Sequence, residues 1–189
     1  MLERVPRRWK WFAAFSLITL VLDQLTKLWA RHGLPVDSRG IGKSVAVIEN
    51  FFDWRLSYNT GSAFGLFSSV TGARIFLTIV GVVALGAIAW MVHKGKNDQR
   101  RLMVGLGLVG GGAIGNVIDR VAFGKVTDFV VWKWYSHEWP TFNVADAALC
   151  VGVGLLFLDL GKQAKEEKAR QDAEKATEKA KPSEKKKKK

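Results

Sequence analysis

The chain has 189 residues, of which 48% are hydrophobic, and a formal net charge of +12. This length allows one domain, and the hydrophobic residues lie in four blocks separated by polar stretches, which is not typical of a soluble protein. The positive charge does not indicate nucleic-acid binding, because much of it lies in a lysine-rich C-terminal stretch for which anionic membrane lipid is the expected partner.

Each hydrophobic block has close to the ~20 residues that a helix needs to cross ~30 Å of hydrocarbon. We therefore predict four membrane-spanning helices, over residues 11–30, 70–92, 102–123 and 141–160. Basic residues precede the first block, as in a secretory signal, but the block contains Asp23 and Lys27 and lacks a cleavage site of small residues. We interpret it as an uncleaved first span.

The distribution of basic residues predicts how the spans are oriented. Lysine and arginine gather before the first block, between the second and third, and after the fourth, which is typical of cytoplasmic loops. Both termini are therefore expected in the cytoplasm, and residues 31–69 and 124–140 outside the membrane. The eight tryptophans lie at block ends or in these outer stretches, as in interfacial aromatic belts.

The outer stretches contain the only sign of β-structure. Apolar and polar residues alternate over residues 54–58, which predicts a strand that ends in a turn at residues 59–62. Residues 63–69 are small and aromatic and suit a segment at the membrane interface. The predicted fold class is thus an all-α polytopic membrane protein, with four transmembrane helices and a small extracytoplasmic β-containing segment.

The C-terminal stretch predicts a separate tail. Residues 162–189 are rich in alanine, glutamate and lysine and end in five lysines, a composition that seldom builds a core. We expect a membrane domain over residues 1–161 and a basic low-complexity cytoplasmic tail over residues 162–189 with no activity of its own. The single cysteine, Cys150, lies in an apolar block, so neither a disulfide nor a thiolate metal site is expected.

Polar residues inside the spans indicate a functional site, because ionisable groups in a membrane need a partner or a function. They gather near the outer ends of three blocks: Asp23 in the first, Asn116, Asp119 and Arg120 in the third, and Asn143 and Asp146 in the fourth. Spacings of three or four residues place each set on one helical face, which predicts a shared pocket. An ion pair between Asp119 and Arg120, with Asn143 as a helix cap, would also fit the pattern.

Hydrolysis at a membrane surface can use a metal ion, a nucleophilic serine or a pair of carboxylates. The three histidines lie far apart and form no zinc motif, so we expect no metal and no cofactor. Ser62 has no histidine in a span to activate it, and Lys27, the alternative base, shares its helix with Asp23. Both of these chemistries are therefore disfavoured.

A pair of aspartates is the third chemistry. Two carboxylates held close together share one proton, so that one of them can activate water while the other donates a hydrogen. Asp128, in the second outer stretch, could meet Asp146 in this way. Because such a pair titrates as a unit, the sequence does not assign base and acid.

Five segments carry a more specific signal: DQLTK at residues 23–27, NTGSAF at 59–64, GAIGNVIDR at 112–120, VTDF at 126–129 and FNVAD at 142–146. In order and spacing they resemble the motif series of bacterial lipoprotein signal peptidases (signal peptidase II). Five ordered motifs are far more specific than any one of them. The resemblance covers about residues 11–160 and excludes the lysine-rich tail.

This resemblance implies an aspartyl endopeptidase that removes the signal peptide from diacylglyceryl-modified prolipoproteins, just before the lipidated cysteine. It implies catalytic roles for Asp128 and Asp146. The implied substrate-binding residues are Asn59, Asn116, Arg120 and Asn143, and the implied supporting residues are Asp23 and Asp119. It further implies a monomer in the bacterial inner membrane, with the active site at the outer face and no nucleic-acid partner.

Two other functions fit part of the pattern. A proton-coupled transporter also carries intramembrane aspartate and arginine, but its acids would be spread through the depth of the membrane, whereas the second and fourth blocks lack a mid-membrane carboxylate. A non-catalytic scaffold would use the glycine-rich third block for assembly. The scaffold predicts that Asp128→Asn and Asp146→Asn retain function.

Overall fold

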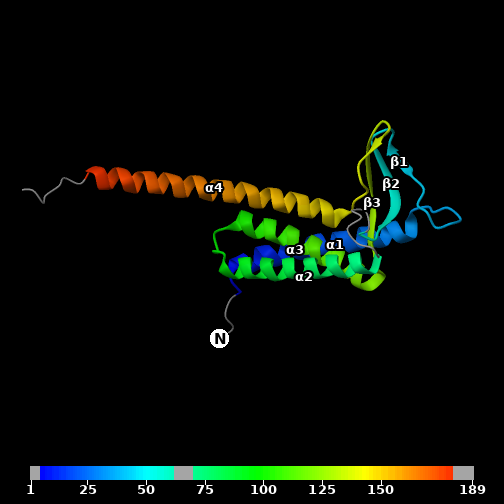
Figure 1. Ribbon diagram of the computed structural model, residues 1–189, viewed down its shortest axis with the longest axis horizontal. Coiled ribbons are helices and arrows are strands. Elements are labelled where there is room, and N and C mark those ends of the chain that lie inside the picture. The colour runs from blue at the N-terminus through cyan, green and yellow to red at the C-terminus, as the bar shows by residue number, and fades with distance from the viewer. Residues whose placement is uncertain (1–4, 62–69, 181–189) are drawn as a thin grey trace, which may run out of the picture.

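The computed structural model of the chain describes residues 5–61 and 70–180. Four helices dominate it (Figure 1): α1 (Arg7–Gly33), α2 (Val70–Lys94), α3 (Arg100–Phe123) and α4 (Val144–Ala180). All four are long and apolar enough to cross a membrane, which confirms the predicted class of fold. Helix α3 is the central one, since it packs against α1, α2 and α4 and has the largest buried share of the four.

Helix α4 differs most from its predicted bounds. It begins at Val144 instead of residue 141, and it continues past residue 160 to Ala180, so that its far end extends beyond the other helices (Figure 1). The extension is built from alanine, glutamate, lysine and arginine, which favour helix. Ion pairs one turn apart, Lys162–Glu166 at 3.5 Å and Arg170–Glu174 at 3.0 Å, add to this preference.

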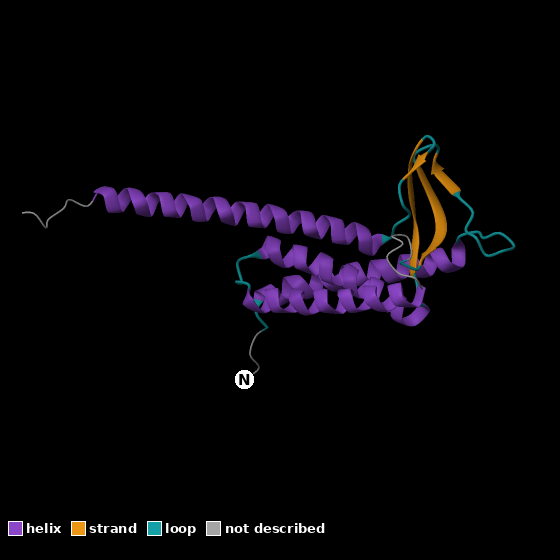
Figure 2. Cartoon of the chain, viewed as in Figure 1, coloured by secondary structure: helices purple, strands orange, loops and turns teal. Residues whose placement is uncertain are grey.

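An antiparallel sheet stands across one end of the helix bundle (Figure 2). Its strands are β1 (Val45–Ile48), β2 (Phe52–Asn59), β3 (Val126–Trp134) and β4 (His137–Glu138), paired in that order. The strand expected at residues 54–58 is the centre of β2. In the β2–β3 pairing, Ser57 lies opposite Asp128 and Asn59 opposite Val126. The expectations for Ser62 and for residues 63–69 fall outside the described residues.

A small hydrophobic cluster attaches the sheet to the bundle. Phe129 of β3 is buried against Ala30 and Leu34 at the end of α1 and Leu56 of β2. The Trp29 ring meets that of Phe129 edge-on at 6.0 Å between centroids. Because successive side chains of a strand point to opposite faces, anchoring Phe129 in this cluster turns Asp128 the other way.

Glycines let α3 approach its neighbours closely, as the sequence predicts. A Cβ added at Gly111 would lie 2.8 Å from the Thr19 Cβ of α1, and one added at Gly112 would lie 2.6 Å from the carbonyl oxygen of Ala145 in α4. Across the same contact, the Ser16 hydroxyl donates to the Gly107 carbonyl at 3.0 Å. The backbones of α1, α3 and α4 are thus held close together.

This packing predicts opposite effects for two glycine-to-alanine substitutions. We expect Gly111→Ala to lower the free energy of unfolding by about 1–3 kcal/mol, because its Cβ overpacks the α1–α3 contact. Gly86→Ala in α2 is the matched control: nothing lies within 4 Å of its Cβ, and alanine favours helix over glycine. Thermal unfolding in detergent measures both, and an unchanged midpoint for Gly111→Ala would contradict the close approach.

Candidate active site

The structure brings all eight residues expected at the site into one polar cluster. It lies where the ends of α1 and α3 and the start of α4 meet the first residues of β3. Its members are Asp23, Asn59, Asn116, Asp119, Arg120, Asp128, Asn143 and Asp146, joined by the hydrogen bonds and charge contacts described below. The predicted convergence of polar residues from three helices is therefore present, and residues of β2 and β3 complete the cluster.

Two asparagine side chains connect the two aspartates at its centre. The Nδ2 of Asn143 donates to Oδ1 of Asp128 at 2.7 Å, and the Nδ2 of Asn116 donates to Oδ1 of Asp146 at 2.9 Å. The two amides also meet each other, with Asn143 Nδ2 3.3 Å from Asn116 Oδ1. Asp128 is buried and Asp146 half-buried, so the pair is reached from the Asp146 side.

The surroundings of Asp128 favour its protonated form near neutral pH. Burial, the largest cause, and the negative charge of Asp146 together raise the pKa of Asp128 to about 7. Hydrogen bonds from Asn143 and Asn59 and the charge of Lys27 act in the opposite direction. A carboxyl group poised near pH 7 suits a general acid or base.

Asn143 lies outside α4 and caps it. Its Oδ1 accepts the N–H of Asp146 at 3.0 Å, while the Oδ2 of Asp146 accepts the N–H of Asn143 at 3.3 Å. This reciprocal arrangement is a capping box, so the capping interpretation and the pocket interpretation of Asn143 are both correct. Because the cap occupies Oδ1, the Nδ2 of Asn143 is left to face Asp128.

Asp119 links the end of α3 to α1 and to β3, and its ion partners are residues of α1. It lies 3.1 Å from Arg31 and 3.6 Å from Lys27, in place of the expected pair with Arg120. Its Oδ2 also accepts the N–H of Thr127 at 2.9 Å, one residue before Asp128. Asp119 therefore fixes the start of β3.

Asp23 performs the same task for α4. Its Oδ1 accepts the N–H of Ala145 at 2.9 Å, one residue before Asp146, and its Oδ2 lies 2.9 Å from Lys27 Nζ. Gly115 leaves room for this carboxylate, since an added Cβ there would meet Asp23 Oδ2. Each aspartate of the pair is thus held by a buried acid bonded to the backbone beside it.

Arg120 and Asn59 border the pair. The Arg120 guanidinium donates to the Asn116 carbonyl at 3.4 Å and interacts electrostatically with Asp146 and Asp128. Asn59 accepts the N–H of Gly61 at 2.9 Å, in a turn where Gly61 has a φ of 80° that favours glycine. Both side chains therefore lie beside the two aspartates.

Sequence reasoning missed three members of the cluster: Lys27, Arg31 and Thr127. Lys27 was considered only as a base for serine, yet it contacts Asp23, Asn116 and Asp119. Its spacing of four residues from Asp23 and from Arg31 could have placed all three on one face of α1. Thr127 contributes its backbone N–H, for which no side-chain pattern gives a signal.

Within residues 5–61 and 70–180, no group of three or more histidine, cysteine, aspartate or glutamate side chains is arranged to hold a metal ion. The charged partners of the acids in the cluster are Lys27, Arg31 and Arg120. The arrangement therefore supports proton transfer between carboxyl groups and water.

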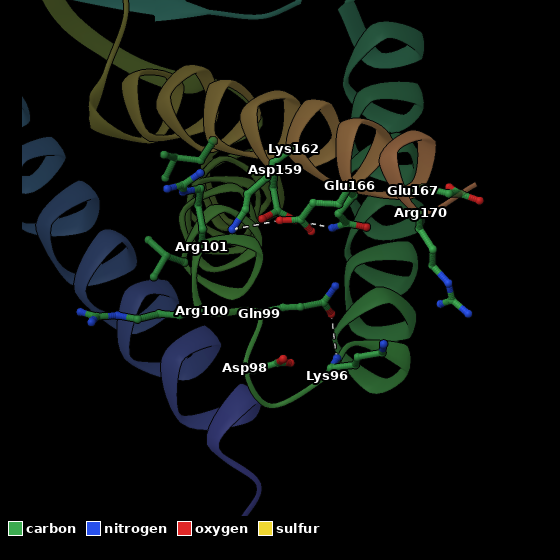
Figure 3. Close-up of a pocket in the computed structure, with 13 residues that line it drawn as sticks. Lys96, Asp98, Gln99, Arg100, Arg101, Asp159, Lys162, Glu166, Glu167 and Arg170 are labelled. Carbon is green, nitrogen blue, oxygen red and sulfur yellow. Dashed lines mark hydrogen bonds and ion pairs between the residues drawn. The ribbon is translucent and has the colours of Figure 1, made fainter. Parts of the chain in front are cut away.

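A separate cavity of about 930 Å³ lies at the far end of the bundle, between the α2–α3 turn and α4 (Figure 3). Its walls carry charged side chains of both signs, including the Lys162–Glu166 pair. It contains none of the eight expected site residues. The candidate active site is accordingly the polar cluster beneath the sheet.

Comparison with known proteins gives a consistent result. Residues 15–162 match the family model described as "Signal peptidase (SPase) II", a stretch that includes every expected site residue. The chain is 41% identical over 149 residues to the lipoprotein signal peptidase of Geobacter metallireducens, covering 79% of this chain and 89% of that protein. It is 40% identical over 162 residues to that of Pseudomonas putida, covering 84% and 90%.

Solved structures agree with the fold. Two structures described as a bacterial membrane enzyme superpose with a TM-score of 0.70 each, at 29% and 30% identity. The first covers 82% of this chain and 90% of its own, and the second 79% and 91%. The four-helix arrangement with its sheet is thus shared with membrane enzymes.

Proposed function

The chain belongs to the signal peptidase II family, and from that premise we propose that it removes signal peptides from prolipoproteins with Asp128 and Asp146 as its catalytic pair. Family membership makes it a protease, and its four apolar helices make it a multi-pass membrane protein. The observation that supports the aspartic mechanism is the pair itself: a buried and a half-buried carboxyl group, each receiving an asparagine N–H.

The pair would act on a water molecule and the scissile carbonyl group. The ionised carboxylate takes a proton from water as the water oxygen attacks the carbonyl carbon, and the protonated one donates to the carbonyl oxygen. Arg120, half-buried beside both aspartates, would bind the substrate backbone and offset the charge that develops. The carboxyl groups and the substrate would be held in position by hydrogen bonds from Asn59, Asn116 and Asn143.

The proposed substrate carries a diacylglyceryl group on the cysteine after the cleavage site. Its acyl chains can remain in the bilayer beside the helices while the scissile bond reaches Asp128 and Asp146 at the membrane edge. Anchoring by lipid would supply much of the orientation that the reaction needs. One chain contributes both aspartates, so a monomer suffices.

The proposed orientation places the polar cluster and the sheet at the outer face of the inner membrane, with both termini in the cytoplasm. It is supported by the basic residues at the opposite end of the bundle, among them Lys94, Lys96, Arg100 and Arg101 around the α2–α3 turn. Lipid and the prolipoprotein are the expected partners, and nucleic acid is not.

Cleavage by the purified protein tests this function. We expect the full chain in detergent to cut a diacylglyceryl-modified lipobox peptide just before the modified cysteine, because the lipid positions the bond. The same peptide without the lipid is the control and should be cut far more slowly. Mass spectrometry identifies the cleavage position, and no cleavage by a folded preparation would favour a transporter or a scaffold instead.

A further inference from the structure

Lys27 is the largest side chain that is fully buried in the described residues, with 0% exposure. Its Nζ donates to Oδ1 of Asn116 at 2.8 Å and lies 2.9 Å from Asp23 and 3.6 Å from Asp119. Two carboxylates thus balance the buried ammonium group, and its third partner is a neutral amide. That amide leads directly to the catalytic pair.

An ammonium group can only donate hydrogen bonds, whereas an asparagine side chain has one end that accepts and one that donates. Lys27 therefore requires that Oδ1 of Asn116 face it. The Nδ2 of Asn116 must then point the other way, where it donates to Oδ1 of Asp146 at 2.9 Å. Lys27 is the nearer of two donors to Oδ1 of Asn116, the other being Asn143 Nδ2 at 3.3 Å, and it thus helps to fix which end of the amide Asp146 meets.

Both hydrogen bonds that Asp146 accepts come from N–H groups, which stabilise a carboxylate. One carboxylate oxygen accepts from Asn116, and the other accepts the backbone N–H of Asn143 at 3.3 Å. Asp146 also lies in the first turn of α4, where the helix dipole stabilises a negative charge. Both oxygens therefore accept from N–H donors, and an ionised carboxylate accepts such bonds more strongly than a protonated one.

Asp128 has a different environment. It lies in a strand and is 2% exposed. It accepts hydrogen bonds from the side chains of Asn143 and Asn59, whereas the half-buried Asp146 also accepts a backbone N–H. The two carboxyl groups are therefore unequal before any substrate binds.

We propose that Lys27 is a positioning residue which, through Asn116, keeps Asp146 ionised and leaves the shared proton on Asp128. This inference rests on the proposed function, since it assigns roles within that pair. Burial and the charge of Asp146 raise the pKa of Asp128 to about 7, which agrees with the assignment.

The remaining charged groups around the pair are consistent with this division. Asp23 of α1 and Asp119 of α3 face Lys27, Arg31 of α1 pairs with Asp119, and Arg120 of α3 faces both catalytic aspartates. Because Asp23 and Asp119 offset the charge of Lys27, its main effect on Asp146 passes through the orientation of the amide.

The assignment specifies the proton transfers. Asp146 takes a proton from water as the water oxygen bonds to the carbonyl carbon, and Asp128 donates its proton to the carbonyl oxygen, giving a tetrahedral diol. Asp146 then donates its new proton to the leaving nitrogen as the C–N bond breaks, and Asp128 takes the proton of the hydroxyl group that becomes the new carbonyl. Both aspartates end in their starting states.

Infrared titration of the carboxyl groups tests the proton position without substrate. We expect the full-length protein to show a protonated carboxyl band that titrates near pH 7 and is absent in Asp128→Asn. In Asp146→Asn the band should remain, with its midpoint at lower pH because a neighbouring negative charge is gone. A band lost in Asp146→Asn and kept in Asp128→Asn would overturn the assignment, even if the protein cleaves its substrate.

Lys27→Gln and Lys27→Arg separate orientation from packing. Glutamine can donate or accept, so it holds Asn116 in one orientation less firmly, and the shared proton is then less confined to Asp128. We expect the protonated carboxyl band of Lys27→Gln to be only partly lost when Asp128→Asn is added, and kcat of Lys27→Gln to fall about tenfold or more with KM nearly unchanged and an altered pH dependence. Arginine is also a cation that can only donate hydrogen bonds, so Lys27→Arg should keep the pH dependence of cleavage of the wild type.

Lys133→Gln is the matched control, because Lys133 also lies in an ion-paired site, with Asp53 and Glu138, but makes no contact with the pair. In Lys133→Gln, the midpoint of the infrared titration and the pH dependence of cleavage should equal those of the wild type. An even fall of kcat at every pH in Lys27→Gln, with the protonated carboxyl band fully lost when Asp128→Asn is added, would show a purely structural role and refute the proposal. Absence of cleavage by the wild type would refute the proposed function. The infrared titrations would still show whether Lys27 affects which aspartate holds the shared proton.

Discussion

Asp128→Asn and Asp146→Asn are each expected to reduce kcat by about 10²–10⁴-fold while the protein stays folded. Asparagine has the shape of aspartate, and its carbonyl oxygen can still accept the N–H that Asn143 or Asn116 donates. It cannot, however, exchange a proton with water or with the carbonyl oxygen of the substrate. The double variant should be no slower than the slower single one, because the two residues act as a unit.

Single-turnover cleavage of the lipid-modified peptide by purified variants in detergent measures this effect. Asp37→Asn is a suitable control: hydrogen bonds from the Ile41 and Arg39 N–H groups lower the pKa of this half-buried carboxyl, but it lies in a loop outside the cluster. It should cleave like the wild type. Full activity of either catalytic variant would point to a different pair, such as one that uses Asp119, or to the scaffold function.

Asp119→Ala is expected to lower the free energy of unfolding by about 3–5 kcal/mol, because it removes one partner from a buried ion network. Lys27 and Arg31 would each lose a carboxylate, and the Thr127 N–H would lose its acceptor. Asp119→Asn should be less harmful, since its carbonyl oxygen can keep the bond to Thr127. Both should also reduce cleavage, because the start of β3 carries Asp128.

Unfolding of these variants by denaturing detergent, followed by circular dichroism, measures the loss. Asp37→Ala provides the comparison, because its partner Arg39 is exposed and such surface pairs contribute about 0–1 kcal/mol. Equal losses for Asp119→Ala and Asp37→Ala would show that the Asp119 network does not hold the site together.

The sequence predicted the features that depend on composition and spacing. Hydrophobic blocks of span length predicted the four helices, and the polar residues at their outer ends predicted the cluster, because both signals are local. The chemical argument also reached Asp128 and Asp146 as a possible pair. The resemblance to signal peptidase II motifs selected that pair from the alternatives.

The features that the sequence did not predict depend on contacts between distant segments. Strands β1 and β4 are short and mostly exposed, so they leave little periodicity. The partner of Asp119 could not be chosen from the sequence, because Arg120 is adjacent in the chain whereas Arg31 becomes adjacent only when α1 packs against α3. The role of Lys27 needs the same packing.

The bond between Asp23 and the Ala145 N–H has a consequence for biosynthesis. The two residues are separated by 122 positions, so α1 is made long before α4 exists to receive it. Until then Asp23 and Lys27, one turn apart, can neutralise each other within the emerging helix and lower the cost of inserting it into lipid. Insertion of the last helix then completes the polar cluster, because α4 carries both Asp146 and the Ala145 N–H that Asp23 binds.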